Sequence, residues 1–167
     1  MTTPAPETSP VDQRLARASW GPLPYFLPFV VYVIHTLEEL PGFASWATAH
    51  FGPESTETFA AYHIPLMLLV LLASWQASRA TRANGWVVAA TAFQWQFGVN
   101  ALFHLTTWIT LGVYSPGVVT GAVVSIPATV AYLVWIRRQN RITIRQIWLA
   151  AAIGTAIAAA AIGFLFL

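Results

Sequence analysis

The stretch YFLPFVVYVIHTLEEL, residues 25–40, is an apolar segment of helix length that carries a histidine and two glutamates near its end. About 20 such residues cross the hydrocarbon of a bilayer as a helix, so we predict a membrane helix over Leu23 to Leu40. Ionised carboxylates that face lipid are costly, and Glu38 and Glu39 are therefore expected to turn inward and find a partner or a metal. The segment from His35 to Glu39 thus locates the candidate functional site.

The composition of the whole chain is that of a membrane protein. Of its 167 residues, 57% are hydrophobic and only 8% are charged, and the mean hydropathy is +0.62. The chain has no cysteine, which excludes disulfides, thiolate catalysis and cysteine-ligated metal centres. Its arginines lie in small scattered groups, so we predict no nucleic-acid partner. Any metal must be held by nitrogen and oxygen ligands.

Five apolar runs predict an all-α, polytopic membrane bundle of about five transmembrane helices. After the first run, the other four cover Phe59 to Ser78, Trp86 to Gly112, Gly117 to Ile136 and Ile147 to Leu167. Every arginine precedes the first run or lies between the second and third runs or between the fourth and fifth. The opposite loops, 41–58 and 113–116, contain no basic residue. The positive-inside rule therefore predicts a cytoplasmic N-terminus, and we expect the protein in a bacterial cytoplasmic membrane.

The N-terminal region and the last apolar run carry further expectations. Residues 1–19, rich in Pro, Thr and Ser, are expected to form a disordered cytoplasmic tail, followed by a single transmembrane domain over residues 20–167. A cleaved signal peptide is the alternative for the first run, but cleavage would discard its histidine and glutamates. In the last run, a four-residue repeat of small side chains predicts a close-packing face, within the chain or in a homodimer. This repeat consists of Ala150, Gly154 and Ala158.

Polar residues of three predicted helices share one layer of the membrane. On the first helix, His35, Glu38 and Glu39 fall on one face, so a single ligand is expected to contact all three. His63 lies in the first turns of the second helix. The third helix carries a polar stripe at spacings of four, four and three residues, formed by Gln96, Asn100, His104 and Thr107. Hydrogen bonding between helices is the preferred interpretation of the stripe, except for His104, where a functional role is favoured.

The chemistry of this layer is metal-assisted or acid–base. Two neighbouring carboxylates in a low-dielectric medium resist simultaneous ionisation, so they share a proton or face a cation. Imidazoles and carboxylates are the usual ligands of zinc, iron or manganese, and three ligands leave a position open for water or substrate. The predicted metal ligands are His35, Glu38, Glu39, His63 and His104. The predicted catalytic residues are Glu38, Glu39, His35 and Asn100, with one glutamate as ligand or base and the other as proton donor.

The string His35-Thr36-Leu37-Glu38-Glu39 resembles the signature of a small integral membrane family named for its H-x-x-E-E motif. Asn100 and His104, and the segment Tyr114-Ser115-Pro116-Gly117 followed by Thr120, are similar to further parts of that family's pattern. The resemblance covers roughly residues 30–135. The family has no established activity. The resemblance therefore implies a multi-helix membrane fold and important His and Glu residues, without naming a reaction.

Three functions follow from these observations. We favour a membrane enzyme, a metal-dependent hydrolase or an acid–base isomerase, that acts on a lipid or other hydrophobic small molecule in the outer half of the bilayer. A proton- or cation-coupled transporter is the first alternative, although the five uneven spans show none of the internal repeats common in transporters. The second alternative is a structural or assembly protein whose polar cluster only holds the helices together.

Overall fold

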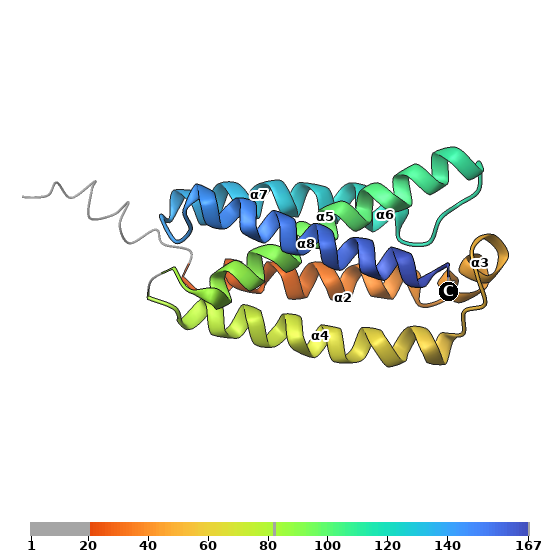
Figure 1. Ribbon diagram of the computed structural model, residues 1–167, viewed down its shortest axis with the longest axis horizontal. Helices are drawn as coiled ribbons and strands as arrows, with labels where there is room; N and C mark the ends of the chain where they lie inside the picture. Colours follow the sequence, from red (N-terminus) through yellow and green to blue (C-terminus); the bar gives the residue numbers. More distant parts are fainter. Residues whose placement is uncertain (1–20, 82, 167) are drawn as a thin grey trace, which may run out of the picture.

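The structure of the protein is a computed structural model that describes residues 21–81 and 83–166. These residues form helices and turns and no strand, which confirms the all-helical prediction. The long helices lie side by side along a common direction (Figure 1). The expected tail over residues 1–19 lies outside the described residues, and the single domain over residues 20–167 stays a prediction.

The long helices follow the predicted apolar runs closely, with a 3-10 turn, Leu23–Phe26, before the first of them. In chain order, the α-helices, short ones included, are α2 (Leu27–Glu39), α3 (Phe43–His50), α4 (Thr56–Arg79), α5 (Gly85–Leu111), α6 (Val118–Thr120), α7 (Ile126–Arg138) and α8 (Ile144–Phe164). Three helical stretches of the described chain are long and apolar enough to cross a membrane. They are Thr56–Arg79, Val118–Arg138 and Ile144–Phe164.

Side-chain and glycine caps set the ends of the central helices. At the start of α4, Ser55 Oγ accepts a hydrogen bond from the Thr58 amide at 3.0 Å, and at the start of α5, Asn84 Oδ1 accepts one from the Val87 amide at 3.1 Å. Each cap satisfies a backbone donor that has no partner within the helix. α5 ends at Gly112, whose φ of +67° suits glycine at a helix C-terminus.

The segment between α2 and α4, expected to be a loop, contains the short helix α3. Pro41 and Gly42 end α2, and the alanine-rich sequence after them favours a new helix. Its buried residues Phe43 and Trp46 pack against Phe59 of α4. α3 therefore closes one end of the bundle. Its eight residues are too few to give a periodic hydrophobic signal in the sequence.

A wide helical turn leads from α6 into α7. Proline cannot donate a backbone hydrogen bond, and its ring crowds the carbonyl four residues earlier. The residues before Pro127, Gly121–Ser125, form a π-helical turn that accommodates it, so the helical run is not broken. A Cβ on Gly121 would lie 3.2 Å from the Cβ of Ala101 on α5. Glycine thus lets this turn approach α5 closely.

α5 lies at the centre of the bundle. It packs against α2, α4, α7 and α8, and most of its first half is buried. Gln94 Nε2 donates to Thr129 Oγ1 of α7 at 3.0 Å, and Thr129 Oγ1 donates to the Gln94 carbonyl at 3.0 Å. This is the interhelical bonding that the sequence predicted for Gln96. Gln96 Oε1 instead has no partner among residues 21–81 and 83–166.

The small-residue face of α8 packs within the chain. Ala150, Gly154 and Ala158 are buried, and α8 makes its main contact with α5. A Cβ on Gly154 would collide with the Ala92 carbonyl oxygen and lie 3.1 Å from the backbone amide nitrogen of Gln96. The predicted packing face of α8 is therefore occupied by α5 of the same chain, the first of the two arrangements that the sequence allowed.

We expect Gly154→Ala to destabilise the protein by about 2 kcal/mol, because the added methyl group has backbone on two sides and cannot be relieved by a rotamer change. The matched control is Gly163→Ala on the same helix, where a Cβ would have no neighbour within 4 Å. It should leave stability within about 1 kcal/mol of wild type. Thermal unfolding in detergent micelles measures both variants. Equal melting temperatures for the two would contradict the close α5–α8 packing.

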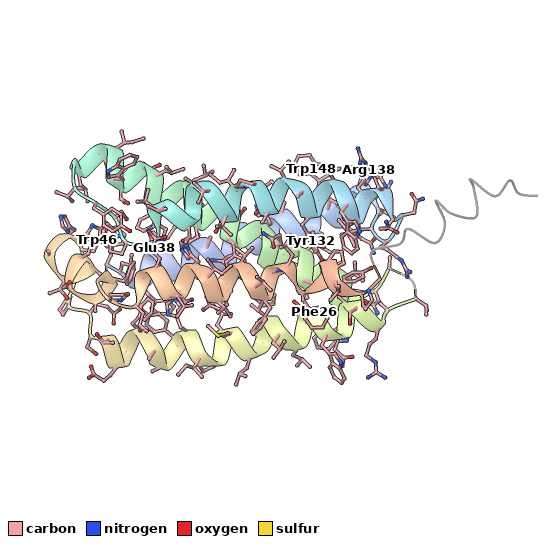
Figure 2. All side chains as sticks on the ribbon, turned by 180° about the vertical axis from the view of Figure 1, so that it is seen from behind. Phe26, Glu38, Trp46, Tyr132, Arg138 and Trp148 are labelled. Atoms are coloured by element: carbon pink, nitrogen blue, oxygen red, sulfur yellow. The ribbon has the colours of Figure 1, made fainter. Side chains whose placement is uncertain are left out.

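The two ends of the bundle differ in charge. The described arginines lie where α4 and α7 end and α8 begins, and they are Arg79, Arg137, Arg138, Arg141 and Arg145. In Figure 2, Arg138 lies at one end of the bundle, whereas Glu38 and Trp46 lie at the other. The glutamates of α2 are therefore at the end opposite the arginines.

Candidate metal centre

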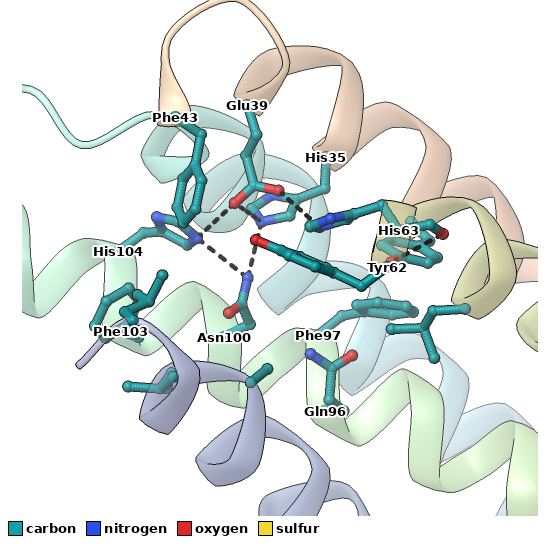
Figure 3. Close-up of a pocket in the computed structure, with 15 residues that line it drawn as sticks. His35, Glu39, Phe43, Tyr62, His63, Gln96, Phe97, Asn100, Phe103 and His104 are labelled. Carbon is teal, nitrogen blue, oxygen red and sulfur yellow. Dashed lines mark hydrogen bonds and ion pairs between the residues drawn. The ribbon is translucent and has the colours of Figure 1, made fainter. Parts of the chain in front are cut away.

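Side chains from α2 and α5 converge at the glutamate end of the bundle. His35 and Glu39 lie one turn apart on α2, and Asn100 and His104 lie one turn apart on α5. Residues four apart share a helix face, so each helix presents a pair, and the two pairs point toward each other (Figure 3). His35, Glu39 and His104 are only 3%, 4% and 1% exposed. The structure thus brings together residues that are far apart in the sequence.

The Glu39 carboxylate is the centre of this group. Its Oε1 lies 3.1 Å from His104 Nε2 and 3.5 Å from His35 Nε2. Asn100 Nδ2 lies 2.9 Å from His35 Nε2 and 3.1 Å from His104 Nε2. Ligands about 2.1 Å from a tetrahedral zinc ion are separated from one another by about 3.4 Å. The spacing of these atoms is therefore compatible with a coordination shell, and His35, Glu39 and His104, whose ligand atoms all lie within 4.8 Å of one another, are called the three-ligand group below.

Hydroxyl groups hold the outer nitrogens of both imidazoles. His35 Nδ1 lies 2.8 Å from Thr120 Oγ1, and His104 Nδ1 lies 3.1 Å from Ser115 Oγ. When Nδ1 donates its proton to a hydroxyl oxygen, Nε2 keeps its lone pair and turns it toward Glu39. This arrangement of an outer hydrogen bond and an inner lone pair is typical of histidines that bind metals.

When both Nε2 atoms carry lone pairs, the inner atoms of the group offer a place for a positive charge. In this tautomer, two imidazole lone pairs and a carboxylate oxygen face one another away from solvent, and the Asn100 amide nitrogen donates to the two lone pairs. Acceptors that face one another in a buried site repel, and a buried carboxylate without a compensating charge is costly. A divalent cation at the centre satisfies all three atoms. In the other neutral tautomer, the hydroxyls donate to Nδ1 and Nε2–H donates to Glu39; this arrangement and protonated imidazoles correspond to the acid–base and structural alternatives.

Gly117 lets the loop before α6 pass directly against both imidazoles. Its φ is +96°, and a Cβ there would lie 2.8 Å from His35 Cε1 and 3.0 Å from His104 Nε2. Only glycine combines this backbone conformation with so little space. The loop over residues 113–117 therefore forms one wall of the centre.

Glu38 points away from Glu39, although the two are adjacent. Its Oε1 accepts hydrogen bonds from the Tyr114 hydroxyl at 2.5 Å and the Val119 amide at 3.1 Å, and its Oε2 accepts one from the Thr120 amide at 2.6 Å. Successive residues of a helix are about 100° apart, so adjacent side chains diverge. The structure does not bring both glutamates to one ligand, contrary to the expectation. Glu38 lies outside the three-ligand group and holds the loop and the start of α6.

The contact between Glu38 and Tyr114 also raises the pKa of the Tyr114 phenol. The hydrogen bond to the carboxylate, with a smaller effect of burial, raises the pKa of Tyr114 to about 12. The hydroxyl, protonated at neutral pH like that of an ordinary tyrosine, donates to Glu38. This bond ties the loop that carries Gly117 to the helix that carries His35.

We expect Glu38→Ala to lower the free energy of unfolding by about 2 kcal/mol, because it leaves the Thr120 and Val119 amides and the Tyr114 hydroxyl without their acceptor. Tyr114→Phe removes one of the three bonds and should cost about 1 kcal/mol. Chemical unfolding in micelles measures both variants. A Glu38→Ala protein as stable as wild type would contradict the anchoring role.

His63 lies at the edge of the group. Its Nδ1 donates to the Phe59 carbonyl at 2.8 Å, and its Nε2 lies 3.8 Å from Glu39 Oε2. The side chain is 17% exposed, more than the other two histidines. His63 therefore faces Glu39 from outside the three-ligand group, at a distance greater than a hydrogen bond.

A cavity of about 90 Å³ lies beside the centre, between α2, α4, α5 and α8. His35, Glu39, His63, Asn100 and His104 all line it, so the polar group opens onto this space. The remaining wall is mostly aromatic and aliphatic and includes Tyr32, Leu66, Phe97, Phe103 and Ile162. The volume holds several water molecules or part of a small apolar ligand.

Two residues of the site could not be identified from spacing alone. Ser115 and Thr120, which hold the imidazoles, drew attention only through the family resemblance. Ser115 begins a Ser-Pro-Gly turn and Thr120 is the last residue of α6, and nothing in a single sequence indicates that this segment folds back onto α2 and α5. His50, which was not predicted to be a ligand, lies in α3 with its Nδ1 on the Trp46 carbonyl at 2.8 Å.

The comparisons with known proteins give a family and no activity. A family model described as "Protein of unknown function with HXXEE motif" matches residues 26–132. The match includes every residue of the three-ligand group, together with Glu38, His63, Asn100, Ser115 and Thr120. No curated protein and no solved structure matches the chain.

Proposed function

Because the chain belongs to the family of proteins with an HXXEE motif, whose description names no activity, we propose its function from the site itself. We propose a membrane-embedded, metal-dependent hydrolase that acts on a lipid or other hydrophobic substrate. The observation that carries the proposal is the buried convergence of His35 Nε2, His104 Nε2 and Glu39 Oε1 on one point. An acid–base isomerase in which the same residues move protons without a metal is the alternative within the enzyme class.

The ligand set suits a catalytic ion. Two imidazoles and one carboxylate leave a coordination position open, and a divalent ion in such a site polarises a carbonyl or lowers the pKa of a bound water. Zinc is the first ion to test, since hydrolysis needs no redox change, and iron and manganese accept the same ligands. Asn100 Nδ2 donates to both Nε2 atoms, and it would give up these hydrogen bonds when the imidazoles bind an ion.

His63 has the position of a proton-transfer residue. It lines the cavity, its Nδ1 is occupied by a backbone carbonyl, and its Nε2 is directed toward Glu39 without being bonded to it. An imidazole with one free nitrogen beside the reacting group can accept a proton from the attacking water and return it to the leaving group. We propose this role for His63 in place of metal ligation.

The surroundings of the site favour a hydrophobic substrate and argue against a transport path. Three helical stretches are apolar enough to cross a membrane, and the cavity wall is largely aromatic and aliphatic. Below the cavity, buried side chains such as Val31, Val70 and Phe93 fill the core of the bundle. A transporter needs access from both sides of the membrane, and this packing supports a site that is reached from one end.

We also propose that five helices cross the membrane with the N-terminus in the cytoplasm of a bacterial cell. The collection of the described arginines at one end of the bundle supports this orientation. The metal centre then lies in the outer half of the bilayer. A cysteine introduced beside Arg138 and another beside Glu54, labelled in intact cells with a membrane-impermeant maleimide, would test this. Labelling of the first position alone would contradict it.

Metal analysis is the direct test of the function. Protein purified in micelles without chelators should contain about one ion per chain, and His104→Ala should contain almost none. His50→Ala is the control, because His50 lies in α3 outside the group, and it should keep the ion. The loaded protein should hydrolyse a medium-chain 4-nitrophenyl ester, and His104→Ala should not. Wild-type protein that binds none of the three metals would refute the metal-dependent enzyme and leave the acid–base isomerase or an assembly role.

A further inference from the structure

Gln96 is a buried amide that the site described so far does not use. It lies one helical turn before Asn100 on α5 and lines the same cavity (Figure 3). The residue is 6% exposed, and its Oε1 has no hydrogen-bond partner in the described part of the chain. An unsatisfied buried amide oxygen is costly, and such groups in native proteins usually await a water or a ligand.

A structural role for the Gln96 side chain has no support in its contacts. The neighbouring Gln94 makes the polar link between α5 and α7, through Thr129. The close contact with Gly154 of α8 involves the backbone nitrogen of Gln96 and not its side chain. Gln94 Oε1 also lacks a partner, but of these two glutamines only Gln96 lines the cavity, so the Gln96 amide points to a ligand there.

The shape of the cavity indicates what kind of ligand this is. The metal centre and Gln96 are separated by about one turn of α5, which corresponds to about 6 Å along the helix. Between and around them, the stacked rings of Tyr32 and Phe97, 5.0 Å apart, and the side chains of Leu66 and Ile162 form an apolar wall. The cavity thus offers two polar positions in an otherwise apolar space.

We infer that Gln96 binds a second polar group of the substrate while the reacting carbonyl lies at the His35, Glu39 and His104 centre. This inference rests on the proposed hydrolase function. It defines the substrate class as an acyl compound with an aliphatic chain and an amide or hydroxyl group a few bonds from the scissile carbonyl, as in an N-acyl amino acid derivative. Without substrate, a water molecule satisfies the Gln96 amide, and the substrate replaces it.

Two chelating probes of equal length distinguish a hydrogen bond between Gln96 and the ligand from a general loss of ligand affinity. N-decanoylglycine hydroxamate carries an amide next to its metal-binding head, and tridecanohydroxamate carries methylene groups in its place. Both are titrated into the Co²⁺-loaded protein in micelles, and binding is followed by visible absorption. Gln96→Leu should weaken the amide-containing probe about five- to tenfold and leave the hydrocarbon probe within about twofold.

Gln94→Leu is the matched control, because it removes a buried glutamine two residues away whose side chain bonds Thr129 and does not line the cavity. It should lower the melting temperature and leave the ratio of the two affinities unchanged. Gln96→Met, similar in length and without hydrogen-bonding groups, replaces Gln96→Leu if the latter does not fold, and it should give the same selective loss.

The outcomes distinguish this inference from the function on which it rests. Suppose that Gln96→Leu and Gln96→Met bind Co²⁺ normally and that the affinities of the two probes either stay unchanged or fall equally. This result overturns the role of Gln96 and leaves the metal centre intact. Wild-type protein that binds neither Co²⁺ nor either hydroxamate overturns the proposed function, and the substrate assignment with it. A loss confined to the amide-containing probe supports the inference.

Discussion

Glu39→Gln is expected to empty the proposed metal centre while leaving the fold intact, with the metal content falling from about one ion per chain to below about 0.1. Glutamine has nearly the same shape as glutamate, so the packing around position 39 is retained. It lacks the negative charge, and Glu39 is the acid of the three-ligand group. Its Oε1 lies beside both imidazole Nε2 atoms, so no other described carboxylate can replace it there. Hydrolysis of the test ester should be lost together with the ion.

The adjacent Glu38→Gln variant is the control for this experiment. The chemical change is the same, but the Glu38 carboxylate bonds the Tyr114 hydroxyl and the amides that begin α6. It should cost stability and keep the metal. Elemental analysis and thermal unfolding of both variants show which glutamate is needed for metal binding and which for stability. A Glu38→Gln protein without metal, beside a Glu39→Gln protein that retains it, would reverse the roles assigned to the two residues.

Gly117→Ala is expected to lower the free energy of unfolding by about 3 kcal/mol and to empty the centre as well. Part of the cost is the positive φ of +96°, which an L side chain rarely adopts. The remainder comes from the methyl group, which would lie 2.8 Å from His35 Cε1 and 3.0 Å from His104 Nε2. Relief requires that one or both imidazoles move, and either movement breaks the convergence on Glu39.

Gly112→Ala separates the two causes. Gly112 also has a positive φ, +67°, but a Cβ there would have no neighbour within 4 Å. Its cost should be only about 1 kcal/mol, and its metal content should equal that of wild type. Chemical unfolding and elemental analysis of the two variants give the comparison. Similar losses of stability in both, with metal retained in Gly117→Ala, would show that the loop does not pack against the imidazoles as described.

The helical fold could be predicted because its signals are local. A helix in lipid must satisfy its own backbone hydrogen bonds, so each apolar run such as Trp86 to Gly112 predicts one helix without knowledge of its neighbours. α5 follows that run almost residue for residue. Membership of the family was likewise predicted from local signals, the short strings around His35, His104 and Tyr114, and the family match confirms it. α3 was missed because eight residues give no periodic signal.

Part of the site was predictable for a related reason. A charged or imidazole side chain within an apolar run must find a polar partner, so five residues were expected to meet: His35, Glu38, Glu39, His63 and His104. Three of them, His35, Glu39 and His104, form the three-ligand group. The choice between the two glutamates could not be made in this way. Both are intramembrane acids by sequence, and which one faces α5 depends on the rotation of α2 about its axis. Likewise, the interhelical bond expected at Gln96 is formed by Gln94, because α7 packs against that side of α5.

By itself, the sequence determined a helical membrane protein of the HXXEE family with histidines and glutamates in one layer, because hydrophobic runs and the cost of buried charge act within single segments. Only the tertiary structure decided that Glu39 faces the two imidazoles while Glu38 anchors a loop. It also decided that Gly117 lies against those rings and that Gln96 is left without a partner beside the cavity. These facts depend on how helices rotate and pack against one another, and the packing of distant segments is not encoded in the spacing of residues along one of them.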